Sequence, residues 1–322
     1  MRKLLVVLAL SLGVFPATAD ITAPAPWCHA GGPLEASTLP RRVLPHVCDL
    51  EGRTIRDGPL RIVVPPPGQM VGSEAMFTDG STQLFEVRTL ADGSVTFRDV
   101  GPESVEGHNT HGGGTAGPHQ NPCTDDAYTL SEARDTGPHE WFFKASTTPS
   151  GLSVGAVAQD LLTGTNAVTS SHNDCELADE VDAHQAYRGN TTRGSGINFE
   201  GTCGSEGDGH YTVDFGNLPD NNLARTCWRG LKTAEGWYEI TEADVKLRNA
   251  ATFFTGVTPR GCSGSRFSLQ AVITHEVGHV YGIRHVTEDL HPELTMSERT
   301  PACSVDPVTL GLGDIMALRA LY

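Results

Sequence analysis

The sequence predicts an α/β (α+β) protein, built on a twisted, mixed sheet and preceded by a small β-rich or irregular N-terminal region. Three observations support this class. Residues 122–322 interleave strand-like alternation with helix-like apolar periodicity. Residues 20–121 are rich in glycine and proline around one hairpin pattern. The length of 322 residues is enough for two domains, which we place at 20–121 and 122–322.

Residues 1–19 have the three parts of a secretory signal peptide. Arg2 and Lys3 give a positive start, residues 4–15 form an apolar run, and residues 17–19 read A-x-A. The apolar run is too short to span a bilayer, although a retained signal anchor is the alternative. We therefore expect a secreted, extracellular protein with no membrane span.

The formal net charge of −16 limits the choice of partners. An acidic surface repels phosphate backbones and anionic membranes, so we expect no nucleic acid or membrane partner. The same charge keeps an extracellular protein soluble. Oligomeric state cannot be deduced from the sequence, and a monomer is the default expectation.

Eight cysteines follow the signal segment, and none of them forms a C-x-x-C motif. In an exported protein, an even number of cysteines is typical of disulfides rather than of a cysteine metal site. Spacing alone leaves the connectivity open. We favour neighbours in sequence order, with the best argument for the first pair, since both its members lie in the N-terminal region: Cys28–Cys48, Cys123–Cys175, Cys203–Cys227 and Cys262–Cys303.

The N-terminal region, residues 20–121, has recognisable local signals but no predicted role. Strand-like residues 82–87 and 94–100 flank the turn signal at 91–93 and predict a hairpin. Further along the chain is a set of residues that invites a second metal site: His108, His111, His119 and Cys123. Because this loop is rich in glycine, solvated histidines and a disulfide-bonded Cys123 are the alternative interpretation.

The C-terminal region, residues 122–322, predicts strands and helices in alternation. This order of elements is typical of an α/β sandwich with a mixed sheet. The expected strands are 141–144, 210–215, 223–228 and 238–247, and the expected helices are 152–169, a helix that begins after Ser268, and 315–322.

Residues 275–285 carry the chemistry, because they read H-E-x-x-H-x-x-G-x-x-H. His275 and His279 are four residues apart and therefore lie on one face of a helix. Gly282 allows the chain to leave the helix in a conformation that a Cβ atom would resist, and the turn brings back His285. Three protein ligands and one open position are typical of a catalytic zinc ion.

Glu276 follows the first histidine and should project beside the metal. There it can take a proton from water and later pass it to a leaving amine. The predicted reaction is amide hydrolysis, most plausibly in a peptide. The alternative is a buried helix whose histidines face solvent.

Several segments resemble the matrixin branch of the metzincin zinc peptidases, particularly its secreted bacterial members. They are the motif at 275–285, Leu294-Thr295-Met296-Ser297, the tail 312–322, and the stretches 223–227 and 240–245. The resemblance covers residues 138–322 and does not reach the N-terminal region. It implies a metzincin-type fold with a Met-turn, one catalytic Zn²⁺, and endopeptidase activity on polypeptide substrates.

The resemblance also implies roles for residues that support the zinc site. Met296 lies 11 residues after His285, where the methionine of the Met-turn packs beneath the metal. Asp314 takes the second position of an aspartate pair that usually opens the last helix. Glu298 stands where astacins and serralysins carry a tyrosine, which favours matrixins. The backbone of Leu223, Ala224 and Arg225 would bind substrate as an added strand at the sheet edge.

Two further implications concern calcium and latency. Residues 206–209 could hold a structural Ca²⁺, with an acidic turn free of metal as the alternative. The chain has no P-R-C-G-x-P-D segment, so the cysteine switch of animal matrixins is missing. Two hypotheses therefore stand beside an active peptidase: a precursor blocked by residues 20–121 without a thiolate, and a non-catalytic binding protein.

Overall fold

The computed structural model describes residues 25–29, 31–99, 121–219, 221–250 and 252–322. The predicted signal peptide lies outside the described residues, as do His108, His111 and His119. The second metal site therefore stays a prediction, although Cys123 is disulfide-bonded to Cys175.

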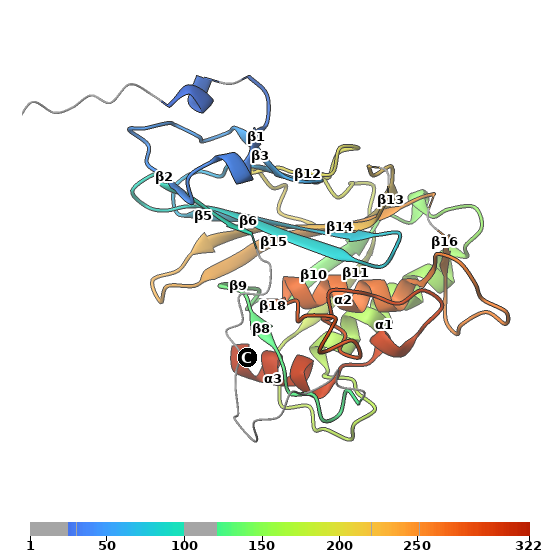
Figure 1. Cartoon of the computed structure of the whole chain (residues 1–322). Coiled ribbons are helices and arrows are strands. Elements are labelled where there is room, and N and C mark those ends of the chain that lie inside the picture. Colours follow the sequence, from blue (N-terminus) through green and yellow to red (C-terminus); the bar gives the residue numbers. More distant parts are fainter. Residues whose placement is uncertain (1–24, 30, 100–120, 220, 251) are drawn as a thin grey trace, which may run out of the picture.

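A mixed sheet, to which the described residues contribute ten strands, forms the middle layer of the molecule (Figure 1). In spatial order the strands are β11 (Gln185–Asn190), β10 (His139–Phe143), β13 (Tyr211–Gly216), β15 (Tyr238–Arg248), β14 (Asn222–Lys232), β5 (Gln69–Phe77), β6 (Thr82–Thr89), β7 (Val95–Asp99) and β2 (Arg42–Val43), with β9 (Ala133–Arg134) beside β15. The first four strands in this order are parallel to one another, and the pairing is antiparallel from β14 onward.

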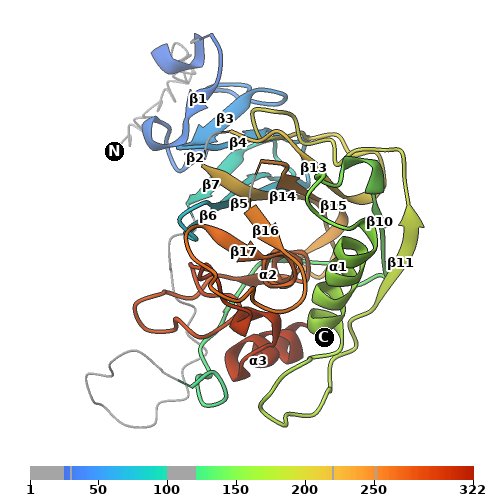
Figure 2. The same cartoon turned by 90° about the vertical axis from the view of Figure 1, so that its right-hand side faces the viewer.

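The helices lie on one face of this sheet and a small second sheet lies on the other (Figures 1 and 2). The α-helices of the described residues are α1 (Val154–Thr169), α2 (Leu269–Val280) and α3 (Leu312–Leu321). The small sheet contains β1 (Leu34–Glu35), β3 (Thr54–Asp57), β4 (Leu60–Val63) and β12 (Thr202–Cys203). Two further strand pairs are present: β16 (Thr252–Phe254) with β17 (Arg266–Ser268), and β8 (Thr129–Leu130) with β18 (Ile283–Arg284). The described residues also form the 3-10 turns η1 (Pro26–His29), η2 (Ala36–Thr38), η3 (Ala145–Thr147) and η4 (Asp306–Val308).

Helix α2 begins and ends where its sequence indicates. The Ser268 hydroxyl accepts a hydrogen bond from Ala271 N at 3.2 Å, which caps the helix. Gly282 follows the helix with φ of 90°, and a Cβ atom there would lie 2.6 Å from the Ala133 carbonyl oxygen. All but one of its twelve residues are buried, so packing against α1 and the sheet stabilises it.

The predicted pairing of all eight cysteines is confirmed: Cys28–Cys48, Cys123–Cys175, Cys203–Cys227 and Cys262–Cys303 form the disulfides. The expected hairpin is present as β6 and β7, and the helices expected at 152–169, after Ser268 and at 315–322 are present as α1, α2 and α3. No helix in the described ranges has the length and apolar character that a bilayer crossing requires.

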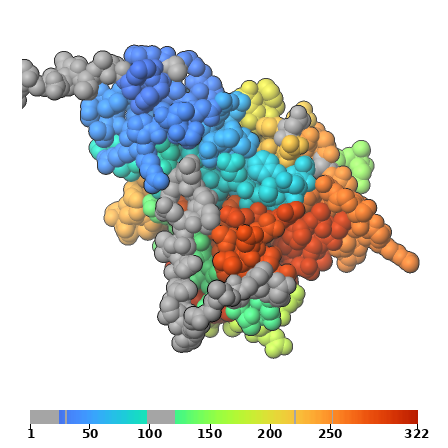
Figure 3. Space-filling view, viewed as in Figure 1, coloured from blue at the N-terminus to red at the C-terminus, as the bar shows by residue number. Residues whose placement is uncertain are grey.

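Residues 25–99 and 121–322 share one sheet, because β5 pairs with β14 along its length. Figure 3 shows the N-terminal residues, in blue to cyan, seated directly on the orange and red C-terminal third. Met70, Met76 and Leu84 enter the core beneath the helices, and Ile197 and Leu218 enter the core on the opposite face. The predicted boundary at residue 121 is therefore not a boundary in the packing.

Candidate metal centre

Three histidine side chains converge at one buried point. Nε2 of His275 lies 3.3 Å from Nε2 of His279 and 3.1 Å from Nε2 of His285. The remaining Nε2 pair, His279 and His285, is 3.0 Å apart. Helix α2 supplies the first two side chains, and the turn after Gly282, through β18, supplies the third. The prediction that these three residues come together is confirmed.

The other ring nitrogens fix how these histidines are protonated. Nδ1 of His275 donates to the Thr295 carbonyl and Nδ1 of His279 donates to the Ile283 carbonyl, each at 2.8 Å. Because a carbonyl only accepts, the Nε2 atoms of these two rings carry lone pairs. Burial also lowers the pKa of all three histidines, most strongly for His279 and His285.

Such an arrangement fits a metal ion. Tetrahedral coordination at about 2.0–2.1 Å would place neighbouring nitrogens roughly 3.3 Å apart. Without a cation, the converging lone pairs repel one another. Hydrogen bonds from Nδ1 to carbonyl oxygens are also the usual way in which metal-binding histidines are oriented.

A fourth side chain, Glu74 of β5, joins this cluster. Its Oε1 lies 3.7 Å from His275 Nε2 and 3.8 Å from His285 Nε2. One ligand atom from each of these four residues falls within 4.8 Å of all the others. Among the described residues, this is the one group of three or more His, Cys, Asp or Glu side chains with metal-binding geometry.

Glu74 is fully buried, and among the described residues no N–H or alcohol group donates to its carboxylate oxygens, whose one hydrogen-bond contact is the Glu276 carboxyl. Burial raises its pKa to about 7, with partial offsets from Glu276 and Arg225. A buried carboxylate without donors is costly unless it is neutralised by a proton or a cation. The orphaned carboxylate beside three Nε2 atoms is therefore a second sign of a metal site.

Glu276, the predicted general base, lies in the same buried volume. Its Oε2 accepts a hydrogen bond from the Thr226 hydroxyl of β14. Burial raises the pKa of the Glu276 carboxyl well above its usual range, and the nearby Glu74 carboxyl raises it further. The two carboxyl groups lie in one site, where the hydrogen bond between them favours the ionised form of Glu74 and the protonated form of Glu276.

The predicted supporting residues hold the segment after His285. Met296 is buried under α2, where a Cβ atom on Gly278 would lie 2.3 Å from its Sδ atom. The Asp314 carboxylate accepts hydrogen bonds from Gly311 N, Thr295 N and Met296 N at 2.9, 3.0 and 3.2 Å. Since Thr295 in turn accepts from His275, Asp314 positions a metal-facing ring through one intermediate residue.

The predicted substrate edge at Leu223, Ala224 and Arg225 is covered in the intact chain, and substrate binding there stays a prediction. These residues belong to β14, which pairs with β15 on one side and β5 on the other. With both edges occupied, their backbone cannot accept an added strand. The sequence alone gave no warning, because a sheet edge is covered here by residues far away in the chain.

Three residues of the site were missed by sequence reasoning. Glu74 and Thr226 are isolated polar residues in strands, and no local spacing links them to the histidines. Thr82 of β6 places its Oγ1 3.4 Å from His285 Nδ1. One signal was available in the sequence, because a glycine inside a strand often marks the close approach of another group. A Cβ atom on Gly72 would lie 2.0 Å from the Trp228 indole, which stacks on His279.

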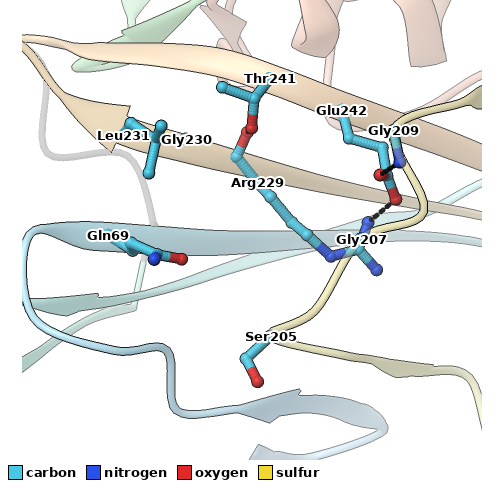
Figure 4. Close-up of a pocket in the computed structure, with 9 residues that line it drawn as sticks. All are labelled: Gln69, Ser205, Gly207, Gly209, Arg229, Gly230, Leu231, Thr241 and Glu242. Atoms are coloured by element: carbon cyan, nitrogen blue, oxygen red, sulfur yellow. Dashed lines mark hydrogen bonds and ion pairs between the residues drawn. The ribbon is translucent and has the colours of Figure 1, made fainter.

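The acidic segment 206–209 lies beside a separate pocket, shown in Figure 4. There the Glu242 carboxylate accepts hydrogen bonds from the Arg229 guanidinium and Gly209 N. Asp208 instead pairs with Arg193 at 3.4 Å. Among the described residues, no side chain of this segment belongs to a group of three or more His, Cys, Asp or Glu with metal-binding geometry, so a calcium site there stays a prediction.

No family model matches the chain, and a comparison with curated proteins likewise gave no match. What the structure shows is a mixed α/β protein with a buried cluster of three histidines and a glutamate that could hold a metal ion.

Proposed function

We propose that this protein is a secreted zinc-dependent endopeptidase of matrixin-like, metzincin type. The observation that carries the proposal is the convergence of three neutral histidine Nε2 atoms beside the carboxylate of Glu276. Nitrogen-only donors with a buried carboxylate suit zinc better than calcium or magnesium, which prefer oxygen ligands. Four disulfides fit an oxidising, extracellular environment.

When bound, zinc supplies the Lewis acidity that makes a water molecule nucleophilic near neutral pH. Glu276 takes the proton of that water and delivers it to the leaving amine nitrogen. The Thr226 hydroxyl donates to Oε2 and leaves Oε1 of Glu276 free to face the reacting atoms. Asp314 and Met296 keep the histidine rings in place from below.

The test is cleavage of casein by the secreted chain, before and after limited digestion with V8 protease, which cuts after glutamate (Glu103 and Glu106 follow β7) and is then inhibited. Glu276→Ala, treated identically, is the matched control. We expect this variant to lose activity by about 10²-fold or more. We also expect 1,10-phenanthroline to abolish cleavage and its non-chelating 1,7 isomer to have no effect. Cleavage that survives in Glu276→Ala would contradict the proposal.

A second candidate function follows from Glu74. Four protein ligands close a metal site, which is typical of structural rather than catalytic zinc. In that case the domain would serve as a binding scaffold stabilised by its metal. A zinc-loaded chain that never cleaves casein, before or after V8 digestion, would favour this alternative.

A further inference from the structure

We propose that β5 keeps this peptidase latent, by supplying Glu74 as the fourth metal ligand and by occupying the strand edge of β14 that a substrate needs. The inference rests on the proposed function, because latency has meaning only for an enzyme. It gives the hypothesis of a precursor blocked by residues 20–121 a specific strand and a specific residue.

The Glu74 side chain points at the three histidines. It points from β5 into the gap between His275 and His285, and it reaches the cluster from the side opposite helix α2. Three histidines would leave one position open for a water molecule and the scissile carbonyl. The Glu74 carboxylate takes that place, and among the described residues its one hydrogen-bond contact is the carboxyl of Glu276.

Strand β5 also covers the edge of β14 beside the metal position. It runs antiparallel to β14, from Gln69 opposite Leu231 to Phe77 opposite Asn222, with Glu74 directly opposite Thr226. Thr226 is the residue that holds Glu276. An extended peptide that added to β14 beside the metal would have to make these same backbone contacts. Strand β5 therefore excludes a substrate from both the edge and the metal.

The blocking segment, residues 25–99, can be separated from the rest of the chain by a single cut. Cys28–Cys48 lies within residues 25–99, and the other three disulfides lie within 121–322. Since all eight cysteines are paired, no disulfide joins the two segments. One backbone cleavage C-terminal to β7 would leave residues 25–99 held by noncovalent contacts alone.

Many apolar residues of the blocking segment also pack against one another. Ile55, Ile62 and Val87 are fully buried in the core on the face away from the helices. Release would uncover the β14 edge at residues 223–225, where the family resemblance places substrate binding. The edge is covered in the intact chain and becomes available only after β5 leaves.

The experiment asks whether a small ligand can reach the metal in the intact chain. Purified wild type, Glu74→Ala and Glu74→Gln are loaded with Co²⁺ and titrated with acetohydroxamate, and the visible absorption of cobalt is recorded. The matched control is Met76→Ala, which loosens the same face of β5 without removing a ligand. Glu74→Gln keeps the shape of the side chain in case the alanine variant fails to fold.

We expect the Glu74 variants to bind acetohydroxamate at least about tenfold more tightly than wild type, since a site closed by a protein ligand is open only in a minor fraction of molecules. Met76→Ala should behave like wild type. Equal binding by wild type and the Glu74 variants would overturn the inference, as would equal binding by Met76→Ala and Glu74→Ala.

This readout separates the inference from the proposed function. Because β5 still pairs with β14 in Glu74→Ala, this variant should admit the small probe yet leave casein intact. Opening of the metal site in the Glu74 variants, with no casein cleavage after V8 digestion, would support the closure by Glu74 and contradict the peptidase. Casein cleavage after V8 digestion, with acetohydroxamate binding unchanged by the Glu74 substitutions, would contradict only the closure.

Discussion

At the residue scale, the candidate metal centre depends on polar groups that are buried and precisely partnered through the backbone. Asp314 shows this best. Burial raises the pKa of its carboxyl, while the N–H groups of Gly311, Thr295 and Met296 favour its ionised form. The carboxylate therefore fixes both the start of α3 and the turn that carries Thr295 and Met296.

We predict that Asp314→Ala destabilises the protein by about 3 kcal/mol, because it leaves three buried N–H groups without an acceptor. It should also weaken zinc binding, since Thr295 orients His275. Urea unfolding of the zinc-free protein measures the first effect, and competition with a zinc-binding dye measures the second.

Asp314→Asn is the control for this prediction, because one acceptor oxygen remains and the side chain keeps its shape. It should cost less than the alanine variant in both measurements. An alanine variant as stable as wild type would show that the three hydrogen bonds do not hold this turn.

At the element scale, the position of α2 depends on its close approach to α1. Gly164 of α1 makes this approach possible, because a Cβ atom there would lie 3.0 Å from both Gln270 O and Ile273 Cγ2. A Cβ atom on Gly155 of the same helix would meet only the Ser153 hydroxyl oxygen, at an ordinary contact distance of 3.9 Å. One helix thus contains a glycine that packing requires and another that it does not.

These two glycines give a matched pair. We predict that Gly164→Ala destabilises the protein by about 1–3 kcal/mol, since the helices must move apart. Gly155→Ala should be neutral or stabilise by up to about 1 kcal/mol, because alanine is the better helix former and meets no obstacle. Urea unfolding midpoints of the two variants measure both effects. The same sign and size for both would refute the role of Gly164.

Elements defined by local patterns were predictable from the sequence. Helix α2 carries its own cap at Ser268, its apolar stripe and its terminating Gly282, and the three histidines follow from their spacing. Strand β5 carries no comparable signal. Its residues are buried on both faces, with Ser73 and Glu74 among them, so they show no alternation of apolar and polar positions.

The covering of the edge at residues 223–225 was not predicted, for a related reason. Their strand character is local and was predicted, but whether β14 lies at an edge depends on β5, which is distant in the sequence. Pairing between distant strands leaves no periodic trace in either strand. The same limitation hid Glu74, whose partners lie on α2 and beyond it.

At the scale of the whole molecule, covalent and noncovalent connections divide the chain differently. The central sheet and both cores join residues 25–99 to residues 121–322. The disulfides do not. Noncovalent links across the division include the ion pair of Glu86 with Arg284 and the hydrogen bond of Thr82 to the Glu298 carbonyl.

From this division we predict how the chain behaves after a single cut C-terminal to β7, made in practice by inserting a specific protease site after residue 99. The two pieces should elute together from a size-exclusion column in native buffer, because the β5–β14 pairing and the shared cores remain. In urea without any reductant they should separate completely, because no disulfide connects them. The same insertion after residue 150, between Cys123 and Cys175, is the control, and its two pieces should stay linked in urea until a reductant is added. Pieces of the first variant that stay linked under non-reducing conditions would show that the cysteines pair otherwise and that residues 25–99 cannot leave the metal centre by proteolysis alone.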